Sequence, residues 1–111
     1  MDIEIKNLDH VKIINISGDL NAATSTEAEA KITQLIMGGN RNLIIDLERL
    51  NYISSAGLRI FLAANKLIRK SDGEIRFCRF NKTVKEVFEI SGFMMVFKYF
   101  PDLNSAIESF R

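Results

Sequence analysis

The chain has 111 residues, of which 47% are hydrophobic and 26% are charged, and these values are typical of a globular domain rather than of a disordered segment. A formal charge of +1 gives no electrostatic footprint for nucleic acid, and a single cysteine can form no internal disulfide. No apolar run approaches the roughly 20 residues of a membrane span, and the first residues lack the basic and apolar regions of a secretion signal. We therefore expect a cytoplasmic protein with one domain over residues 1–111 that binds neither nucleic acid nor a membrane.

The N-terminal segment predicts a β-hairpin. Residues 2–7, DIEIKN, alternate apolar and polar side chains as a strand does. Residues 11–17, VKIINIS, resume this alternation after a predicted turn at residues 8–10.

A loop and a helix are expected next. The polar and small residues of segment 18–25, GDLNAATS, predict the loop. The helix follows in segment 27–37, EAEAKITQLIM, where apolar residues recur at helical spacing until Gly38-Gly39 ends it. Three hydroxyl side chains are placed to cap this helix: Thr24, Ser25 and Thr26.

The rest of the chain alternates strands with helices. Residues 42–47, NLIIDL, form a nearly continuous apolar run, which is typical of a central strand. Further helices are expected near residues 57–70, 82–93 and from Pro101 onward, and further strands at residues 74–80 and within 94–100. This order predicts an α/β fold in which a mixed central sheet of about four to five strands is covered by about four helices.

The sequence offers little apparatus for enzyme chemistry. It has no Gly-x-Ser-x-Gly elbow and no Gly-x-x-x-x-Gly-Lys phosphate loop. The only histidine, His10, leaves a Ser55–His10–Asp46 set open as a nucleophilic arrangement. Metal ligands would have to come from scattered acids such as Asp19, Asp46 and Glu48, which are better explained as loop and strand-end residues. We expect no catalytic residue, no cofactor and no metal.

Two serines precede the predicted helix at residues 57–70, in the stretch Ser54-Ser55-Ala56-Gly57. One interpretation is structural, because a serine oxygen at a helix N-cap accepts an N–H that the first turn leaves unpaired. The other is functional, because a helix N-terminus tolerates a phosphate, and a phosphorylated serine there adds about −2 of charge to the surface. A glycine in this stretch also leaves the backbone open to close approach by a partner.

Three motifs, in their order and spacing, resemble the STAS-domain anti-sigma factor antagonists. Gly18-Asp19-Leu20-Asn21 stands where family members have Gly-Glu-Leu-Asp, and the apolar strand ends in Asp46-Leu47 as theirs does. Ser54-Ser55-Ala56-Gly57-Leu58 stands where they have Asp-Ser-Ser-Gly-Leu or a close variant. Residues 81–107 also resemble the family's final strand and helix pattern, so the resemblance covers nearly the whole chain.

This resemblance implies a STAS-like single domain that works as a binding protein and not as an enzyme. Such proteins bind a serine-kinase anti-sigma factor that has a histidine-kinase-like ATPase fold. The unphosphorylated antagonist occupies the kinase and frees the sigma factor, whereas phosphorylation by the kinase releases the antagonist. A PP2C-type phosphatase then removes the phosphate. Alignment on Gly57-Leu58 implies Ser55 as the phosphorylated residue, with Ser54 as the alternative.

The resemblance also implies a partner-binding surface made of the predicted loop, the two serines and the start of the helix. Its residues are Asp19, Leu20, Asn21, Ser54, Ser55, Ala56, Gly57 and Arg59. Asn21 and Ser54 replace family aspartates, which removes negative charge near the acceptor and makes a phosphate easier to accommodate. Because Asp19 and Asn21 lie in a predicted loop, we expect substitutions there to cost within about 0.5 kcal/mol of stability.

A second function stays open on the sequence. The same fold is compatible with a STAS scaffold in another bacterial signalling complex that has no sigma factor downstream. Such a scaffold is regulated by phosphate or not, so the two functions differ in whether a sigma factor lies downstream.

Overall fold

The computed structural model describes residues 1–8 and 10–111. Within these residues the strands form one six-stranded sheet. The strands are β1 (Asp2–Leu8), β2 (Val11–Leu20), β3 (Asn42–Asp46), β4 (Leu50–Ile53), β5 (Glu74–Cys78) and β6 (Lys98–Phe100). The helices are α1 (Ser25–Met37), α2 (Ser55–Arg69), α3 (Lys82–Ile90) and α4 (Leu103–Glu108), with a short 3-10 helix η1 (Phe93–Met95). The predicted α/β fold is therefore confirmed, with one strand, β4, that the sequence did not predict.

The sheet is mixed. β1 runs antiparallel to β2, which confirms the predicted hairpin, although the predicted turn includes Asp9, which lies outside the described residues. The strand order is β1-β2-β3-β5-β6, and all pairs other than β1–β2 are parallel. β4 pairs with the last residues of β2, beyond the point where β3 has ended. The ten residues of β2 therefore contact three strands and extend to one end of the molecule.

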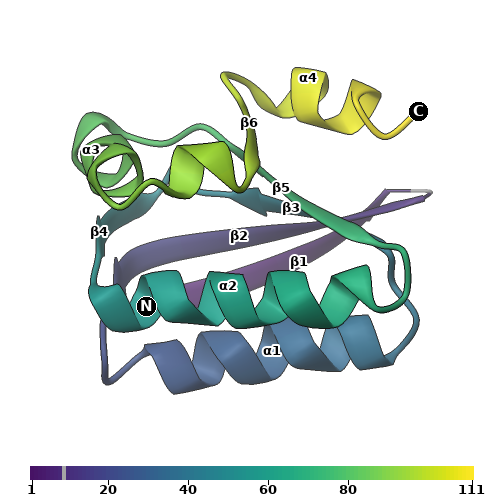
Figure 1. Ribbon diagram of the computed structural model, residues 1–111, viewed down its shortest axis with the longest axis horizontal. Helices are drawn as coiled ribbons and strands as arrows, with labels where there is room; N and C mark the ends of the chain where they lie inside the picture. The colour runs from purple at the N-terminus through teal and green to yellow at the C-terminus, as the bar shows by residue number, and fades with distance from the viewer. Residues whose placement is uncertain (9) are drawn as a thin grey trace.

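Helices cover both faces of the sheet unequally (Figure 1). α1 and α2 lie side by side on one face, and both begin at the end where β2 finishes. The larger core lies beneath them and includes Ile14, Ile16, Leu43, Ile45, Phe61 and Phe77. α4 covers part of the other face, where a smaller core contains Val11, Ile13, Ile44, Cys78, Ala106 and Ile107. Residues of β2 and β3 belong alternately to the larger and the smaller core, because successive strand residues point to opposite faces.

The end of β2 differs from the prediction. Residues 18–20 were expected in a loop, but they continue the strand and pair with β4. Gly18 has φ of +91°, which glycine adopts without steric cost, and the pairing register shifts between Gly18 and Asp19. The resulting bend directs Leu20 into the core, where it is fully buried. The loop is thereby reduced to residues 21–24.

The helix boundaries also differ from the predictions in detail. α2 begins at Ser55, two residues before the predicted start, because Ser54 acts as its N-cap. α4 begins at Leu103, where the Oδ1 of Asp102 accepts the Ser105 N–H at 2.7 Å, so an aspartate cap and not Pro101 sets its start. Hydrogen bonding from Ser105, chiefly from its backbone N–H, lowers the pKa of Asp102.

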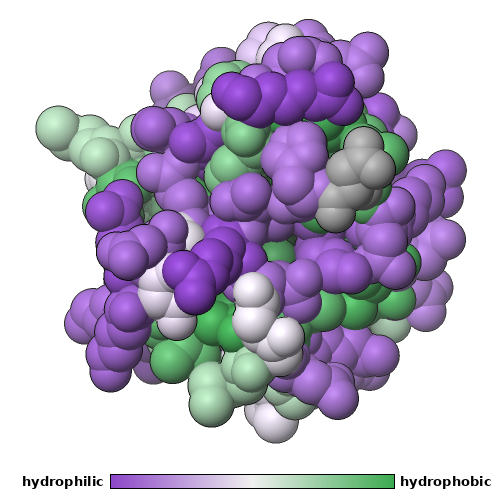
Figure 2. All heavy atoms as spheres, turned by 90° about the vertical axis from the view of Figure 1, so that its right-hand side faces the viewer, coloured by the Kyte–Doolittle hydropathy of each residue, from purple (hydrophilic) through white to green (hydrophobic). Residues whose placement is uncertain are grey.

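The opposite end of the molecule carries the C-termini of α1 and α2. Figure 2 shows this end covered mostly by hydrophilic residues, with apolar side chains visible between them. In the described parts of the chain, no helix is both long and apolar enough to cross a bilayer.

Candidate functional site

Three segments that are distant in the sequence meet at the end of the molecule where α2 begins. The Ser54 N–H donates to the Leu20 carbonyl oxygen at 2.9 Å, which joins the end of β4 to the end of β2. Gly57, in the first turn of α2, packs against Leu20 and Ile53. The serine stretch is therefore held on a rigid corner made by β2, β4 and α2.

The two serines have different environments. The Ser54 Oγ accepts the Gly57 N–H at 3.2 Å, so this hydroxyl forms the helix cap. Ser55 is exposed, and among the described residues no hydrogen bond involves its hydroxyl. The structural interpretation of the stretch thus applies to Ser54, and the Ser55 hydroxyl is left accessible on the surface.

The structure corrects two members of the predicted partner-binding surface. Asp19, Ser55 and Arg59 are exposed, and Asn21, Ser54 and Ala56 are half-buried. Leu20 and Gly57, in contrast, are buried. Gly57 was expected to admit a partner, and in the structure its bare backbone packs against side chains of this chain, Leu20 and Ile53.

An exposed aromatic residue on β4 belongs to the same corner. Tyr52 is 47% exposed and pairs in register with Asp19 of β2. Aromatic side chains are enriched at the centres of protein interfaces, so Tyr52 is a further candidate for the predicted partner-binding surface. Sequence analysis missed it because the strand that carries it was not predicted, although an aromatic residue two positions before the serine stretch was a usable signal.

A buried carboxylate lies on the other face of the sheet. Asp46, at the end of β3, is 2% exposed. Its carboxylate accepts two hydrogen bonds from Arg79, from Nε at 3.1 Å and from Nη2 at 2.5 Å. Arg79 also pairs with Glu48 at 2.5 Å. This bonding to Asp46 raises the pKa of Arg79, so the guanidinium stays charged.

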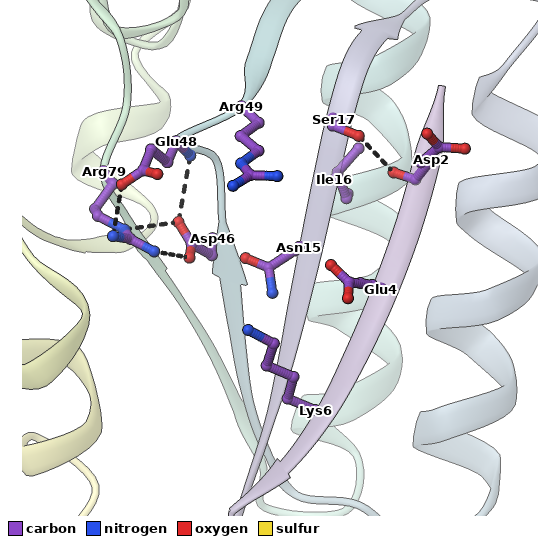
Figure 3. A pocket seen from close by; sticks show the side chains of 10 residues that line it. All are labelled: Asp2, Glu4, Lys6, Asn15, Ile16, Ser17, Asp46, Glu48, Arg49 and Arg79. Atoms are coloured by element: carbon purple, nitrogen blue, oxygen red, sulfur yellow. Dashed lines mark hydrogen bonds and ion pairs between the residues drawn. The ribbon is translucent and has the colours of Figure 1, made fainter.

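Arg79 lies at the edge of a small polar hollow of about 130 Å³ (Figure 3). Asn15 of β2 and Glu4 and Lys6 of β1 line its other side, and Arg49 reaches over it from the turn before β4. Acidic and basic groups are mixed in this hollow, and its buried carboxylate is already paired. The geometry supports a structural role, in which Arg79 fixes the turn between β3 and β4.

The family model described as STAS domain matches residues 2–106. BtrV of Bordetella bronchiseptica, whose name assigns it provisionally to the anti-sigma factor antagonists, is 36% identical over 111 residues, covering 100% of this chain and 96% of that protein. The chain belongs to the STAS domain family. The family resemblance expected from the serine stretch is thereby confirmed.

Two further proteins are similar to this STAS domain, one in sequence and one in structure. The anti-sigma-B factor antagonist of Staphylococcus aureus is 27% identical over 92 residues, covering 83% of this chain and 85% of that protein. The Bacillus cell fate determinant SpoIIAA, solved in its phosphorylated form, superposes with a TM-score of 0.76 at 21% identity. That superposition covers 99% of this STAS domain and 100% of SpoIIAA, which shows a shared fold.

The Ser55–His10–Asp46 arrangement is not assembled in this STAS domain. The His10 carbonyl oxygen accepts a hydrogen bond from Asn42 at the start of β3, whereas Ser55 follows the end of β4. The length of β2, roughly 30 Å at the usual rise per strand residue, separates these two ends of the sheet. Asp46 is paired with Arg79, and no hydrogen bond or ion pair among the described residues joins it to His10 or Ser55. These positions exclude the Ser55–His10–Asp46 set.

Metal and thiol chemistry find no support at this site. Within residues 1–8 and 10–111, no group of three or more His, Cys, Asp and Glu side chains is placed to hold a metal ion. Asp46 and Glu48 are bonded to Arg79, and Asp19 lies at the other end of β4. Burial, followed by the nearby charge of Asp46, raises the pKa of the Cys78 thiol to about 12, which keeps it protonated and unreactive at neutral pH.

Gly57→Ala is expected to destabilise the STAS domain by about 1–3 kcal/mol. A Cβ at this position would lie 2.8 Å from Cγ1 of Ile53 and 3.0 Å from both Cγ and the carbonyl oxygen of Leu20. Urea unfolding followed by circular dichroism measures the change. Helix propensity alone predicts the opposite sign, a gain of up to about 1 kcal/mol, so a more stable variant would show that the contact between α2 and β2 is loose.

Asn21→Ala is expected to cost about 1 kcal/mol of stability, more than a simple loop position would. Its Oδ1 accepts the backbone N–H groups of Ala23 and Thr24 at 2.9 and 3.1 Å. The Thr24 hydroxyl donates to the Asp19 carbonyl oxygen and forms no cap bond to α1, so Asn21 organises the approach to that helix. The earlier expectation of about 0.5 kcal/mol is revised because the structure shows that the loop is anchored.

Asn21→Asp is the matched control, because aspartate keeps the accepting oxygen at the same place. We expect its stability to remain within about 0.5 kcal/mol of the unmodified domain. Thermal unfolding of the three proteins under identical conditions measures both effects, and equal losses in both variants would refute the role of the Asn21 side-chain oxygen.

Proposed function

We propose that this STAS domain is an anti-sigma factor antagonist that is switched by phosphorylation of Ser55. In its unphosphorylated form it binds a serine-kinase anti-sigma factor and thereby releases the sigma factor. Phosphorylation by that kinase weakens the complex, and a PP2C-type phosphatase restores the binding form. The domain acts in the cytoplasm by binding, without a cofactor and without catalysis of its own.

The observation that carries this proposal is that the two serines have different structural environments. Ser54 caps α2 through its Oγ, so the helix start does not depend on the Ser55 hydroxyl. Ser55 stands exposed beside it on a corner that the core holds in place. A kinase needs an accessible hydroxyl that can change without disturbing the fold, and Ser55 meets this requirement.

The similar proteins support the same proposal. BtrV and the Staphylococcus aureus relative are named as anti-sigma factor antagonists, and SpoIIAA has been solved in a phosphorylated form. The surface around Ser55 supplies further groups for a partner: Asp19 and Tyr52 at the strand ends and Arg59 on α2. Two buried members of the predicted surface, Leu20 and Gly57, support this surface from beneath and do not contact the partner.

The proposal is tested by capture of the kinase followed by phosphotransfer. The unmodified domain, Ser54→Ala and Ser55→Ala are each used to retain proteins from the native cell, and the retained kinase is then given ATP and Mg²⁺. Phosphopeptide mass spectrometry should place the phosphate on Ser55 in the unmodified domain and in Ser54→Ala. Ser55→Ala should retain the kinase but remain unphosphorylated.

Two outcomes would contradict this expectation. Phosphate on Ser54 with Ser55 unmodified would move the acceptor by one residue. The modified oxygen would then be the Ser54 Oγ that caps α2. Absence of phosphate from both serines, with a complex still retained, would favour the STAS scaffold that has no sigma factor downstream.

A further inference from the structure

All the charged residues of α2 are basic. The helix sequence SAGLRIFLAANKLIR contains three cations, Arg59, Lys66 and Arg69, and no acidic residue. Ser55 and Arg59 are both exposed and stand four residues apart. Side chains at this spacing lie on the same side of a helix, with Cβ atoms about 5–6 Å apart. Arg59 is therefore the cation on α2 that is closest to the Ser55 hydroxyl.

The stability of the unmodified domain gives no reason for an arginine at position 59. Among the ion pairs and side-chain hydrogen bonds of the described residues, none involves Arg59. A cation near the positive end of the helix dipole is mildly unfavourable, whereas Lys66 and Arg69 in the last turn are favourably placed. Arg59 is thus exposed and has no ion pair or side-chain hydrogen bond among the described residues. It stands one helical turn from the Ser55 hydroxyl, which has no hydrogen bond among them either.

We propose that Arg59 binds the phosphate of a phosphorylated Ser55 within the same chain. The inference rests on Ser55 as the acceptor in the proposed function, and it adds Arg59 as the residue that binds the phosphate once Ser55 carries it. A guanidinium forms paired, charge-assisted hydrogen bonds with phosphate oxygens, and its side chain spans one helical turn easily. No acid on α2 competes for Arg59, and exposed acids on adjoining elements include Asp19 at the end of β2 and Glu27 in the first turn of α1.

This pairing gives the modification two effects on one surface. Before phosphorylation, Arg59 offers a free positive charge to a partner, and Ser55 is neutral. After phosphorylation, the partner meets a new negative charge and also loses access to the arginine, which is occupied. Arg59 is therefore a positioning residue for the phosphate and a specificity residue for the partner.

The test places phosphoserine at position 55 during translation, so it requires neither the kinase nor the phosphatase. The phosphate is then titrated by ³¹P NMR in the unmodified background and in two variants, Arg59→Ala and Lys66→Ala. Both variants remove one positive charge from the exposed side of α2. Lys66 lies roughly 16 Å along the helix axis from Ser55, beyond a direct contact with the phosphate.

Loss of a paired cation should make the doubly charged phosphate less favourable. Arg59→Ala is expected to raise the second pKa of the phosphate by about 0.5, and Lys66→Ala by less than about 0.1. Arg59→Lys, which keeps a point charge but not the planar guanidinium, should lie between them. Circular dichroism of each protein confirms that the fold is retained.

Equal pKa values in the Arg59→Ala and Lys66→Ala proteins would overturn the inference. That result would leave the proposed function intact, because the kinase experiment reports on the acceptor and not on what binds its phosphate. Conversely, a failed phosphotransfer would contradict the proposed function without changing the titration.

Discussion

Ser55→Asp is expected to fold as the unmodified STAS domain does and to bind the kinase anti-sigma factor at least about tenfold more weakly. The fold should tolerate the charge, because the start of α2 stabilises an anion by about 0.3–1 kcal/mol. The complex should not, because a charge that is desolvated without a partner costs roughly 3–5 kcal/mol, and each 1.4 kcal/mol is about a factor of ten in affinity. Aspartate carries only part of the charge of a phosphate, so true phosphorylation should weaken the complex further.

Isothermal titration with the purified kinase measures this loss, and a thermal melt of the free domain verifies the fold. Ser54→Asp is a sharp control, since it adds the same charge one residue earlier and preserves the cap on the Gly57 N–H. It also restores the aspartate that the resemblance places there. We expect Ser54→Asp to bind within about threefold of the unmodified domain. Equal weakening by both variants would show that charge in this region matters, and not the position of Ser55.

Arg79→Met is expected to destabilise the domain by about 3–5 kcal/mol, the second large effect. The substitution removes both hydrogen bonds to the Asp46 carboxylate, whose side chain is 1% exposed. Water cannot replace them readily at a buried site, so the carboxylate would be left without its counter-charge. Arg79 also holds a φ of 60°, a left-handed conformation that costs a non-glycine residue energy, so the pair with Asp46 compensates for backbone strain as well.

Chemical denaturation gives the free energy of unfolding for this variant. Glu48→Gln serves as its control, because Glu48 bonds the same guanidinium from a side chain that is 50% exposed. We expect that exchange to cost no more than about 1 kcal/mol. Combining Arg79→Met with Asp46→Asn should recover part of the loss, since a neutral amide is cheaper to bury than a lone carboxylate. No recovery in the double variant would place the cost in the backbone at position 79 instead.

The sequence predicted most of the fold because apolar periodicity dominates its long elements. Residues 42–47 were predicted as a buried strand from a continuous apolar run, and the helix of residues 57–70 from its apolar stripe. β4 was not predicted, because LNYI is four residues long and its two central side chains are exposed, which leaves no alternation to detect. Leu20 was assigned to a loop because polar and small residues dominate segment 18–25, whereas β2 continues to Leu20 after a register shift between Gly18 and Asp19.

The candidate site was predictable in part for a related reason. The serine stretch carries a local signal, the capping chemistry of Ser54, which the structure confirms, and the family resemblance places the candidate site at the same corner of the molecule. The roles of Gly57 and Arg79 depend on contacts between residues far apart in the chain, with Leu20 and with Asp46. No local pattern encodes such contacts, so a packing glycine was interpreted as an opening for a partner and the buried ion pair was missed.

The bond between Ser54 and Leu20 has a consequence for how a kinase recognises its target. The corner that displays Ser55 is assembled from β2, β4 and α2, and a linear peptide copying residues 50–60 contains no part of β2. An enzyme that reads this corner therefore distinguishes a finished domain from a nascent or proteolysed chain. Under the proposed function, newly made protein would become a substrate only once β2 and β4 have paired, so the folding of the chain would set the earliest moment at which the switch responds.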